Sequence, residues 1–205
     1  MTVEDKDRLR NLIWSTLEAK NLTKEAKPPY GRIPNFIGSA NAAEVLRSTD
    51  EWQNARVIFS SPDSAQKKVR EFALLDSKLL IMASPKLKDG YILIDYNRVK
   101  GNEKTASTID GAFKFGSQIH KFPKVDMVIE GSVAVDKFGN RLGKGGGYGD
   151  MEICHLLEEN AITKSTPVAT TVHEVQIVDE IPTEAHDQKI NMIVTPKRVF
   201  KVKTN

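Results

Sequence analysis

Short apolar segments alternate with segments of helical pattern between residues 56 and 173, and this alternation constrains the fold more than any other feature. The apolar segments are RVIFS (56–60), KLLIMAS (78–84), YILID (91–95), DMVIEGSVAVD (126–136) and PVATTVH (167–173). Helical spacing of apolar residues occurs in 64–75, in 148–159 and, more weakly, in 105–116. Near-continuous apolar strands separated by helices are typical of an α/β sheet that is covered on both faces.

The first fifty residues predict two helices joined by a loop. Residues 4–20 have the pattern of an amphipathic helix, with apolar side chains at a spacing of four. The prolines and glycines of KPPYGRIPNFIG (27–38) forbid regular structure and predict an ordered loop. Ser39 is a candidate N-cap for the second helix.

The length allows one large domain or two small ones, and we expect a single α/β domain over residues 1–205. A chain of 205 residues is long enough to bury a sizeable core. Its 30 basic and 27 acidic residues give a net charge of +3, which fits an anionic ligand but does not by itself indicate nucleic-acid binding. Cys154 is the only cysteine, the N-terminus is too charged for a signal peptide, and no segment has membrane-spanning length. We therefore expect a cytoplasmic protein with no membrane contact.

The segment RLGKGGGYGD (141–150) places five glycines among ten residues. Glycine lets backbone N–H groups approach a ligand closely, and such loops bind phosphate when a helix starts behind them. This segment follows a predicted strand and precedes a predicted helix, where α/β sheets bind ligands. Arg141 and Lys144 would contact phosphate oxygens, and Asp150 would hold Mg²⁺. The alternatives are a plain surface turn and, for Asp150, a helix N-cap.

The segment VHEVQIVDEIPTEAHD (172–187) gathers two histidines and several carboxylates around a proline. The histidines lack the spacing of a zinc motif, and the absence of a second cysteine excludes the usual structural zinc sites. Asp187 is the more informative residue, because its carboxylate could pair with that of Asp150 at the top of the sheet. The alternative is a polar loop that caps a strand.

Two basic clusters carry weaker signals. Lys6 and Arg10 lie four residues apart and therefore share one face of the first helix, where such a pair is usually solvated. The cluster KKVR (67–70) would need interleaved aromatic residues to bind RNA, and the aromatic residues of this chain are scattered. An RNA partner is therefore only a weak hypothesis.

Three of these features occur in the order of one known family. The chain resembles 5-formyltetrahydrofolate cyclo-ligase, also called methenyltetrahydrofolate synthetase, which has K-x-x-L-R near its start and R-L-G-x-G-x-G-Y-Y-D at its centre. The first motif is matched by Lys6, Leu9 and Arg10, and the second by RLGKGGGYGD. A later glutamine, proline and aspartate are matched by Gln176, Pro182 and Asp187. The segments KPPYGRIPNFIG, ASPKLKDG and VIEGSVAVD are similar to a divergent branch, the methenyltetrahydrofolate synthetase domain-containing proteins.

The resemblance implies a three-layer α/β/α sandwich with a mainly parallel sheet. It also implies ATP- and Mg²⁺-dependent conversion of 5-formyltetrahydrofolate to 5,10-methenyltetrahydrofolate through phosphorylation of the formyl oxygen. Lys144 and Asp150 would be catalytic, Asp150 and Asp187 would hold Mg²⁺, and Tyr148 and Gln176 would contact the reduced folate. The expected ATP-binding residues are Lys6, Arg10, Arg141, Gly143, Lys144, Gly145, Gly146, Gly147 and Tyr148.

Two positions depart from the family pattern, and both concern the folate side. The second tyrosine of the central motif is Gly149 here, and the glutamate that contacts the pterin has no clear counterpart, Asp63 being the nearest acid. A lost contact to a pterin edge would shift specificity. Two alternatives therefore stay open: a non-catalytic nucleotide- or RNA-associated binding module, and an ATP-dependent ligase that acts on a different small acceptor.

Overall fold

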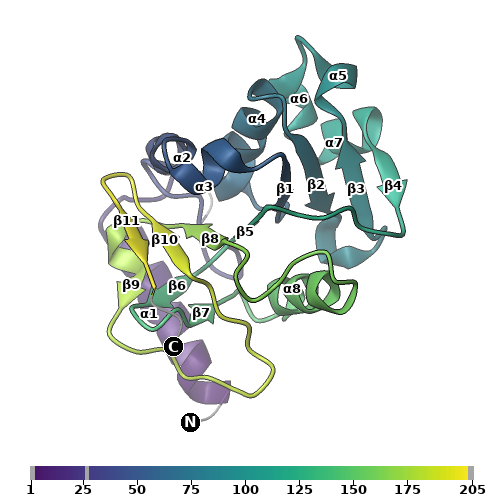
Figure 1. The fold of residues 1–205 in the computed structure, drawn as a ribbon. Coiled ribbons are helices and arrows are strands. Elements are labelled where there is room, and N and C mark those ends of the chain that lie inside the picture. The colour runs from purple at the N-terminus through teal and green to yellow at the C-terminus, as the bar shows by residue number, and fades with distance from the viewer. Residues whose placement is uncertain (1–2, 26–27, 203–205) are drawn as a thin grey trace.

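The computed structural model describes residues 3–25 and 28–202, so the first residue of the predicted 27–38 loop lies outside the described part (Figure 1). The α-helices are α1 (Val3–Ala19), α2 (Ser39–Arg47), α3 (Asp50–Asn54), α4 (Lys67–Leu75), α5 (Tyr96–Val99), α6 (Glu103–Ala106), α7 (Ile109–Phe115) and α8 (Tyr148–Glu158). Short 3₁₀ turns are η1 (Ser64–Gln66), η2 (Pro85–Leu87) and η3 (Glu174–Gln176). Among the described helices, none combines the length and apolar character that crossing a membrane requires.

The strands form one sheet of eight and one of three. They are β1 (Val57–Ser60), β2 (Leu79–Ala83), β3 (Tyr91–Ile94), β4 (Ser117–Ile119), β5 (Met127–Glu130), β6 (Ala134–Asp136), β7 (Arg141–Leu142), β8 (Val168–Thr171), β9 (Ile177–Val178), β10 (Met192–Val194) and β11 (Val199–Lys201). The large sheet has the order β11-β10-β8-β5-β1-β2-β3-β4, and the small one has the order β7-β6-β9. The five strands from β10 to β2 are parallel, whereas β11, β3 and β4 pair antiparallel at the two edges.

Helices cover both faces of the large sheet, which confirms the predicted three-layer α/β/α class. On one face α2, α3, α4, α6 and α7 enclose a core that includes Trp52, Phe72 and Met127. On the other face α8 contributes Ile153 and Leu156 to a second core. The central strands are buried on both sides, as their unbroken apolar runs predict.

The small sheet and α1 form a separate layer beside the large sheet (Figure 1). Ile13, Trp14 and Leu17 of α1 pack with Ala134 of β6 and Leu142 of β7. This packing fixes the helix against the strand that leads directly into the glycine-rich loop. It thereby places the basic residues of α1 next to that loop.

Two segments that the sequence predicts as single elements, 126–136 and 105–116, are each divided into two elements in the structure. The run 126–136 is not one strand: it divides into β5 and β6 at Gly131, where the chain passes from the large to the small sheet. A Cβ atom at Gly131 would lie 2.5 Å from Asp63 Oδ2, so the close approach of these two segments requires glycine. The predicted 105–116 helix divides into α6 and α7, because the side chain of Thr108 caps a new helix by accepting a hydrogen bond from Gly111 N–H.

The predicted cap of the second helix is also wrong. Gly38 is the N-cap of α2, with φ of 95°, and Ser39 is the first helical residue. The Ser39 hydroxyl donates instead to Asn35 Oδ1 in the preceding loop. Glycine serves at this position because a left-handed backbone is needed there.

Candidate active site at the carboxyl end of the sheet

A cavity of about 330 Å³ lies at the carboxyl ends of β1 and β5. These adjacent parallel strands continue in opposite directions across the sheet, β1 to β2 and β5 to β8, so the cavity occupies the switch point where α/β sheets bind ligands. Its walls come from the segments after β1 and β5, the glycine-rich loop and the first turns of α8. Arg70, buried in the core, holds the first wall by donating to the carbonyl oxygens of Ser61 and Asp63.

Arg70 belongs to the cluster KKVR, for which an RNA-binding surface is the weak hypothesis. Its guanidinium is almost completely buried and bonded to backbone carbonyls, and Lys68 pairs with Glu71 on the same helix. These two side chains therefore have structural partners and do not form a free basic patch.

The glycine-rich loop forms one wall of the cavity and delivers the chain to α8. Gly145 and Gly147 have φ of 105° and 67°, a left-handed conformation that disfavours other residues. Gly147 is the N-cap of α8, and no side chain caps this helix. The first N–H groups of the 11-residue helix are therefore left for another acceptor, and they carry the positive end of the helix dipole. This arrangement fits an anion such as a phosphate group.

Arg141 lies beneath the loop as a buried cation. It donates from Nη1 to Gly131 O at 3.1 Å and from Nη2 to Asp150 Oδ1 at 2.8 Å. Burial alone would lower its pKa, but the charges of Asp150 and Glu130 raise the pKa overall. A Cβ atom at Gly149 would lie 2.8 Å from Arg141 Nη2, so the glycine leaves room for the guanidinium.

Asp150 lies in the first turn of α8 but does not cap the helix, so the alternative role as N-cap is wrong. Its Oδ1 accepts hydrogen bonds from Arg141 and from the backbone N–H of Gln188 at 3.0 Å. The second contact brings the backbone of Gln188, which follows Asp187, next to Asp150.

The carboxylates of this region have the oxygen chemistry that Mg²⁺ prefers. Asp187 Oδ2 contacts Lys6 Nζ at 2.7 Å and accepts from Glu184 N–H. Within the described residues, Glu184, His186 and Asp187 place one ligand atom each within 4.8 Å of one another. This group of possible ligands does not include Asp150, and Lys6 compensates the charge of Asp187, so a magnesium ion held between Asp150 and Asp187 stays a prediction.

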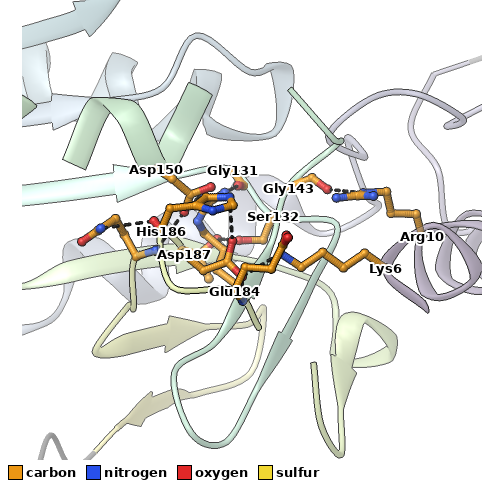
Figure 2. Close-up of polar contacts among 12 residues, drawn as sticks. Lys6, Arg10, Gly131, Ser132, Gly143, Asp150, Glu184, His186 and Asp187 are labelled. Carbon is orange, nitrogen blue, oxygen red and sulfur yellow. Dashed lines mark hydrogen bonds and ion pairs between the residues drawn. The ribbon is translucent and has the colours of Figure 1, made fainter. Parts of the chain in front are cut away.

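Lys6 and Arg10 project from one face of α1 toward this region (Figure 2). Lys6 Nζ contacts Glu184 and Asp187, both at 2.7 Å, and Arg10 Nε donates to Gly143 O at 2.8 Å. Burial lowers the pKa of Lys6, but the hydrogen bonds to the two carboxylates outweigh it and raise the pKa overall. The solvated-face interpretation is therefore wrong for this pair.

The four basic side chains discussed here, Lys6, Arg10, Arg141 and Lys144, each have a carboxylate partner. Lys144 Nζ lies 3.6 Å from Asp63 Oδ1, and Arg10 Nη1 lies 2.6 Å from Asp7 Oδ1. Lys144 is the most exposed of the four cations, with 41% of its side chain accessible. It therefore has the freest access to an incoming anion.

The structure brings most of the predicted site residues to the cavity. Gly143, Lys144, Gly146, Gly147, Tyr148, Arg141 and Asp150 line it. Lys6, Arg10, Gly145 and Asp187 lie beside it through the contacts described above, Gly145 against the Arg10 guanidinium.

Gln176 is the exception among the predicted substrate contacts. Its side chain is 0% exposed, donates to the carbonyl oxygens of Ser132 and Val133, and accepts from His173 N–H. These bonds complete a capping box at η3 and fix the turn between β5 and β6. Gln176 therefore supports the wall of the site and does not line the cavity.

Sequence reasoning missed two acids on the cavity floor. Glu130 ends β5 and Glu152 lies on the inner face of α8, and their exposed fractions are only 2% and 3%. Burial raises the pKa of both acids; the charge of Glu152 raises that of Glu130 further, whereas for Glu152, whose pKa rises to about 8, the hydrogen bond with Glu130 acts in the opposite direction and the repelling charge is that of Asp63. The sequence offered one sign of Glu130, an acid at the end of the apolar run MVIE. It gave no sign of the pairing, because Glu152 lies 22 residues later on a helix.

Comparison with known proteins agrees with this geometry. The sequence profile of the 5-formyltetrahydrofolate cyclo-ligase family matches residues 2–196. The methenyltetrahydrofolate synthase domain-containing proteins of Bos taurus and Homo sapiens are 36% and 34% identical over 206 residues, which is 95% of this chain and 53% of each relative. The chain thus spans about half the length of these curated relatives. A 5-formyltetrahydrofolate cyclo-ligase of Escherichia coli is 35% identical over 78 residues, 38% of this chain and 40% of that enzyme.

Solved structures support the fold. A 5,10-methenyltetrahydrofolate synthetase from Aquifex aeolicus has a TM-score of 0.62 at 21% identity, covering 98% of this chain and 94% of that one. A second, from Mycoplasma pneumoniae, has a TM-score of 0.54 at 16% identity, covering 93% and 98%. With the profile match over nearly the whole length, these findings establish that the chain belongs to the 5-formyltetrahydrofolate cyclo-ligase family.

Proposed function

We propose that this domain converts 5-formyltetrahydrofolate to 5,10-methenyltetrahydrofolate in an ATP- and Mg²⁺-dependent reaction. The observation that carries the proposal is the cavity at the switch point of the sheet. The uncapped N-terminus of α8, the glycine-rich loop and Lys144 all border this cavity. Phosphoryl transfer depends mainly on positioning and charge neutralisation, and a wall of backbone N–H groups and cations supplies both.

The residues of the loop would bind the phosphate groups. Backbone N–H groups at the start of α8 donate to phosphate oxygens, and Lys144 leaves Asp63 to contact them. Arg141 stays buried and keeps Asp150 in position through the bond to its Oδ1. Arg10 holds the loop closed through Gly143 O.

The carboxylates of Asp150 and Asp187 would hold the magnesium ion. When bound, the ion neutralises phosphate oxygens and so favours the transfer of the phosphoryl group. Asp187 has Lys6 as its partner in this structure. Lys6 would be available to contact a phosphate oxygen if Asp187 held the ion instead.

A second candidate is an ATP-dependent ligase that acts on a different small acceptor. Two observations on the acceptor side favour it. Gly149 stands where the family has a tyrosine, and the buried acids Glu130 and Glu152 form the floor of the cavity. Both features alter the surface that an acceptor would contact.

An absorbance assay tests the main proposal. Purified protein is mixed with ATP, Mg²⁺ and 5-formyltetrahydrofolate, and the near-ultraviolet absorbance of the methenyl product is followed. We expect an ATP-dependent rise that Asp150→Asn abolishes and that the matched change Asp110→Asn, on exposed helix α7, leaves intact. A flat trace from protein that binds ATP would overturn the folate reaction and favour the second candidate. Full activity of Asp150→Asn would remove Asp150 from the proposed metal site.

A further inference from the structure

Positive charge is concentrated in the segment 86–124. This segment holds eight Lys and Arg residues against four Asp and Glu residues, a net charge of +4, whereas the whole chain has a net charge of +3. The rest of the chain is therefore left at −1. The eight cations are all exposed and together form the basic edge, which comprises Lys86, Lys88, Arg98, Lys100, Lys104, Lys114, Lys121 and Lys124.

The cations of the basic edge have no carboxylate partners. Within the described part of the chain, every ion pair lies outside the segment 86–124. Two of the four acids in the segment are bonded to backbone N–H groups instead: Asp95 accepts from Asn97, and Glu103 accepts from Gly101. Unlike the cations around the cavity, those of the basic edge can therefore contact an anion without giving up an ion pair.

The basic edge follows the side of the large sheet where β4 is the last strand, with α5, α6 and α7 beside it (Figure 1). Arg98 of α5 donates from Nη1 to Ser117 Oγ of β4 at 3.3 Å. Gln118 of β4 donates from Nε2 to the carbonyl oxygen of Asp89 at 2.8 Å, in the basic turn between β2 and β3. Strand β4 thus connects α5 and this turn into one continuous surface.

The same side of the sheet exposes two rings. Phe113 of α7 is 47% exposed and precedes Lys114, and the exposed His120 follows β4. A Cβ atom at Gly116, just after α7, would lie 2.4 Å from Ile92 Cγ2 of β3, so the end of α7 lies directly on the outer strands. Exposed rings among unpaired cations match a single-stranded nucleic acid, whose phosphates contact the cations and whose unpaired bases stack on the rings. An acidic protein would use the charges alone.

We infer that the basic edge binds a single-stranded nucleic acid, with phosphates on the Lys and Arg side chains and a base stacked on Phe113. Among the eight cations only Lys86 borders the cavity, so the surface extends away from the site of the proposed reaction and does not depend on it. Each phosphate that a cation neutralises releases counterions, so binding weakens steeply with salt. A duplex would keep the charge contacts and lose the contact with the ring, because its bases are stacked on one another.

Two triple variants test the role of the charges. Fluorescence anisotropy measures the binding of a labelled oligouridylate of about 15 nucleotides. The edge variant is Lys88→Ala with Lys100→Ala and Lys121→Ala, and the matched control, which removes three exposed lysines elsewhere, is Lys20→Ala with Lys164→Ala and Lys197→Ala. We expect the edge variant to bind about tenfold more weakly and its slope of log affinity against log salt to fall by about two. The control should keep the affinity and slope of the original protein.

A pair of phenylalanine variants tests the stacked base. Phe113→Ala should weaken binding of the oligouridylate about tenfold, the typical effect of losing one stacked base. The matched control is Phe138→Ala, which removes a ring that is 51% exposed on the turn between β6 and β7 and has Lys137 over it. We expect this control to leave the affinity unchanged. Thermal unfolding checks that each variant is folded.

Four results would overturn the inference. The first is no binding of oligouridylate by the original protein, or equal losses in the edge and control variants. The second is equal affinity for oligouridylate paired with oligoadenylate, together with unchanged binding in Phe113→Ala. The third is binding of polyglutamate and not of oligouridylate, which would assign the surface to an acidic protein. The fourth is displacement of the oligouridylate by excess ATP, which would move its binding to the cavity.

Discussion

The charged side chains of the upper wall and of the floor of the cavity differ in whether they have partners of opposite charge. On the upper wall, which comprises Lys6, Arg10, Arg141 and Lys144, every cation is paired with a carboxylate. On the floor, Glu130 and Glu152 have only each other. Charge on the wall is balanced before any ligand binds, whereas Glu130 and Glu152 form no ion pair with a cation among the described residues.

This difference indicates which half of the site confers specificity. A balanced wall binds phosphate by exchanging partners, which costs little at the exposed Lys144. An unsatisfied, buried floor discriminates strongly between ligands, because a ligand without matching donors leaves polar atoms unpaired. We therefore expect changes in the wall to alter affinity for anions and changes in the floor to alter the choice of acceptor.

Removal of Arg141 should have the largest effect, because this residue joins the two regions. Arg141→Met removes the only cation bonded to Asp150 among the described residues and a donor to Gly131 O, and it leaves the charge of Asp150 uncompensated near the floor. We expect a loss of about 3–5 kcal/mol in the free energy of unfolding, measured by urea denaturation.

The matched control for this prediction is Arg32→Met. Arg32 is half exposed, and its pair with Glu25 is 3.6 Å long. Its loss should cost less than about 1 kcal/mol. Similar midpoints of urea denaturation for Arg141→Met and Arg32→Met would contradict the central role given to Arg141.

The acidic floor predicts an unusual pH dependence of stability. Burial raises the pKa of both floor acids above their values in the unfolded chain, that of Glu152 to about 8, so as pH rises from the ordinary range of a glutamate toward about 8 the folded protein holds protons that the unfolded chain releases. Stability therefore falls as pH rises through this window, by up to about 1.4 kcal/mol per pH unit for each such proton. The charges that act on Glu130 are those of Glu152 and Asp63, which raise its pKa, and that of Arg141, which lowers it.

Glu130→Gln isolates this effect, because the amide does not titrate. Urea denaturation at pH 5 and pH 8 should show a smaller loss of stability in the variant than in the original protein. The difference between the two proteins removes the contribution of other groups, including His173, whose pKa burial lowers. Parallel pH profiles would show that Glu130 is ionised in the folded state.

Substitution of Lys144 should have a moderate effect confined to anions. Lys144→Ala removes the most exposed cation of the wall, and we expect ATP affinity to fall about tenfold, as measured by calorimetry. Lys164→Ala, at an exposed position outside the cavity, should leave ATP affinity unchanged. Unchanged affinity in Lys144→Ala would refute the phosphate-binding role of this side chain.

Gly149→Ala should have the smallest effect and probes the contact between loop and wall. The new methyl group would lie 2.8 Å from Arg141 Nη2 and would push the guanidinium away, at a net cost of about 1 kcal/mol in unfolding free energy. In Gly143→Ala the corresponding contact with Arg141 Nη1 is 3.3 Å, so a smaller loss is expected. The reverse ranking would show that Gly149 has another role.

The sequence predicts the parts of this structure that depend on local pattern. Apolar runs identify the central strands, and the glycine spacing identifies the loop before α8. Strands β7 and β9 have two residues each, too few to form a recognisable pattern. Their existence depends on the small sheet and its packing with α1.

For the site, too, the sequence predicts only those residues that belong to a local motif. Motif residues such as Lys144 and Asp150 belong to one ten-residue segment, and both line the cavity. The floor was not predictable, because Glu130 and Glu152 meet only through the packing of α8 over β5. Gln176 shows the converse case, in which a motif residue bonds to the backbone inside the fold.

Separable binding at the wall and the floor is the central claim, and calorimetry on two variants tests it most directly. ATP and 5-formyltetrahydrofolate are titrated separately into the original protein, Lys144→Ala and Glu152→Gln. We predict that Lys144→Ala weakens the binding of ATP and not of the folate, and that Glu152→Gln weakens the binding of the folate and not of ATP. Loss of the same ligand in both variants, or of neither ligand in either, would contradict the division of the cavity into a phosphate-binding wall and an acceptor-binding floor.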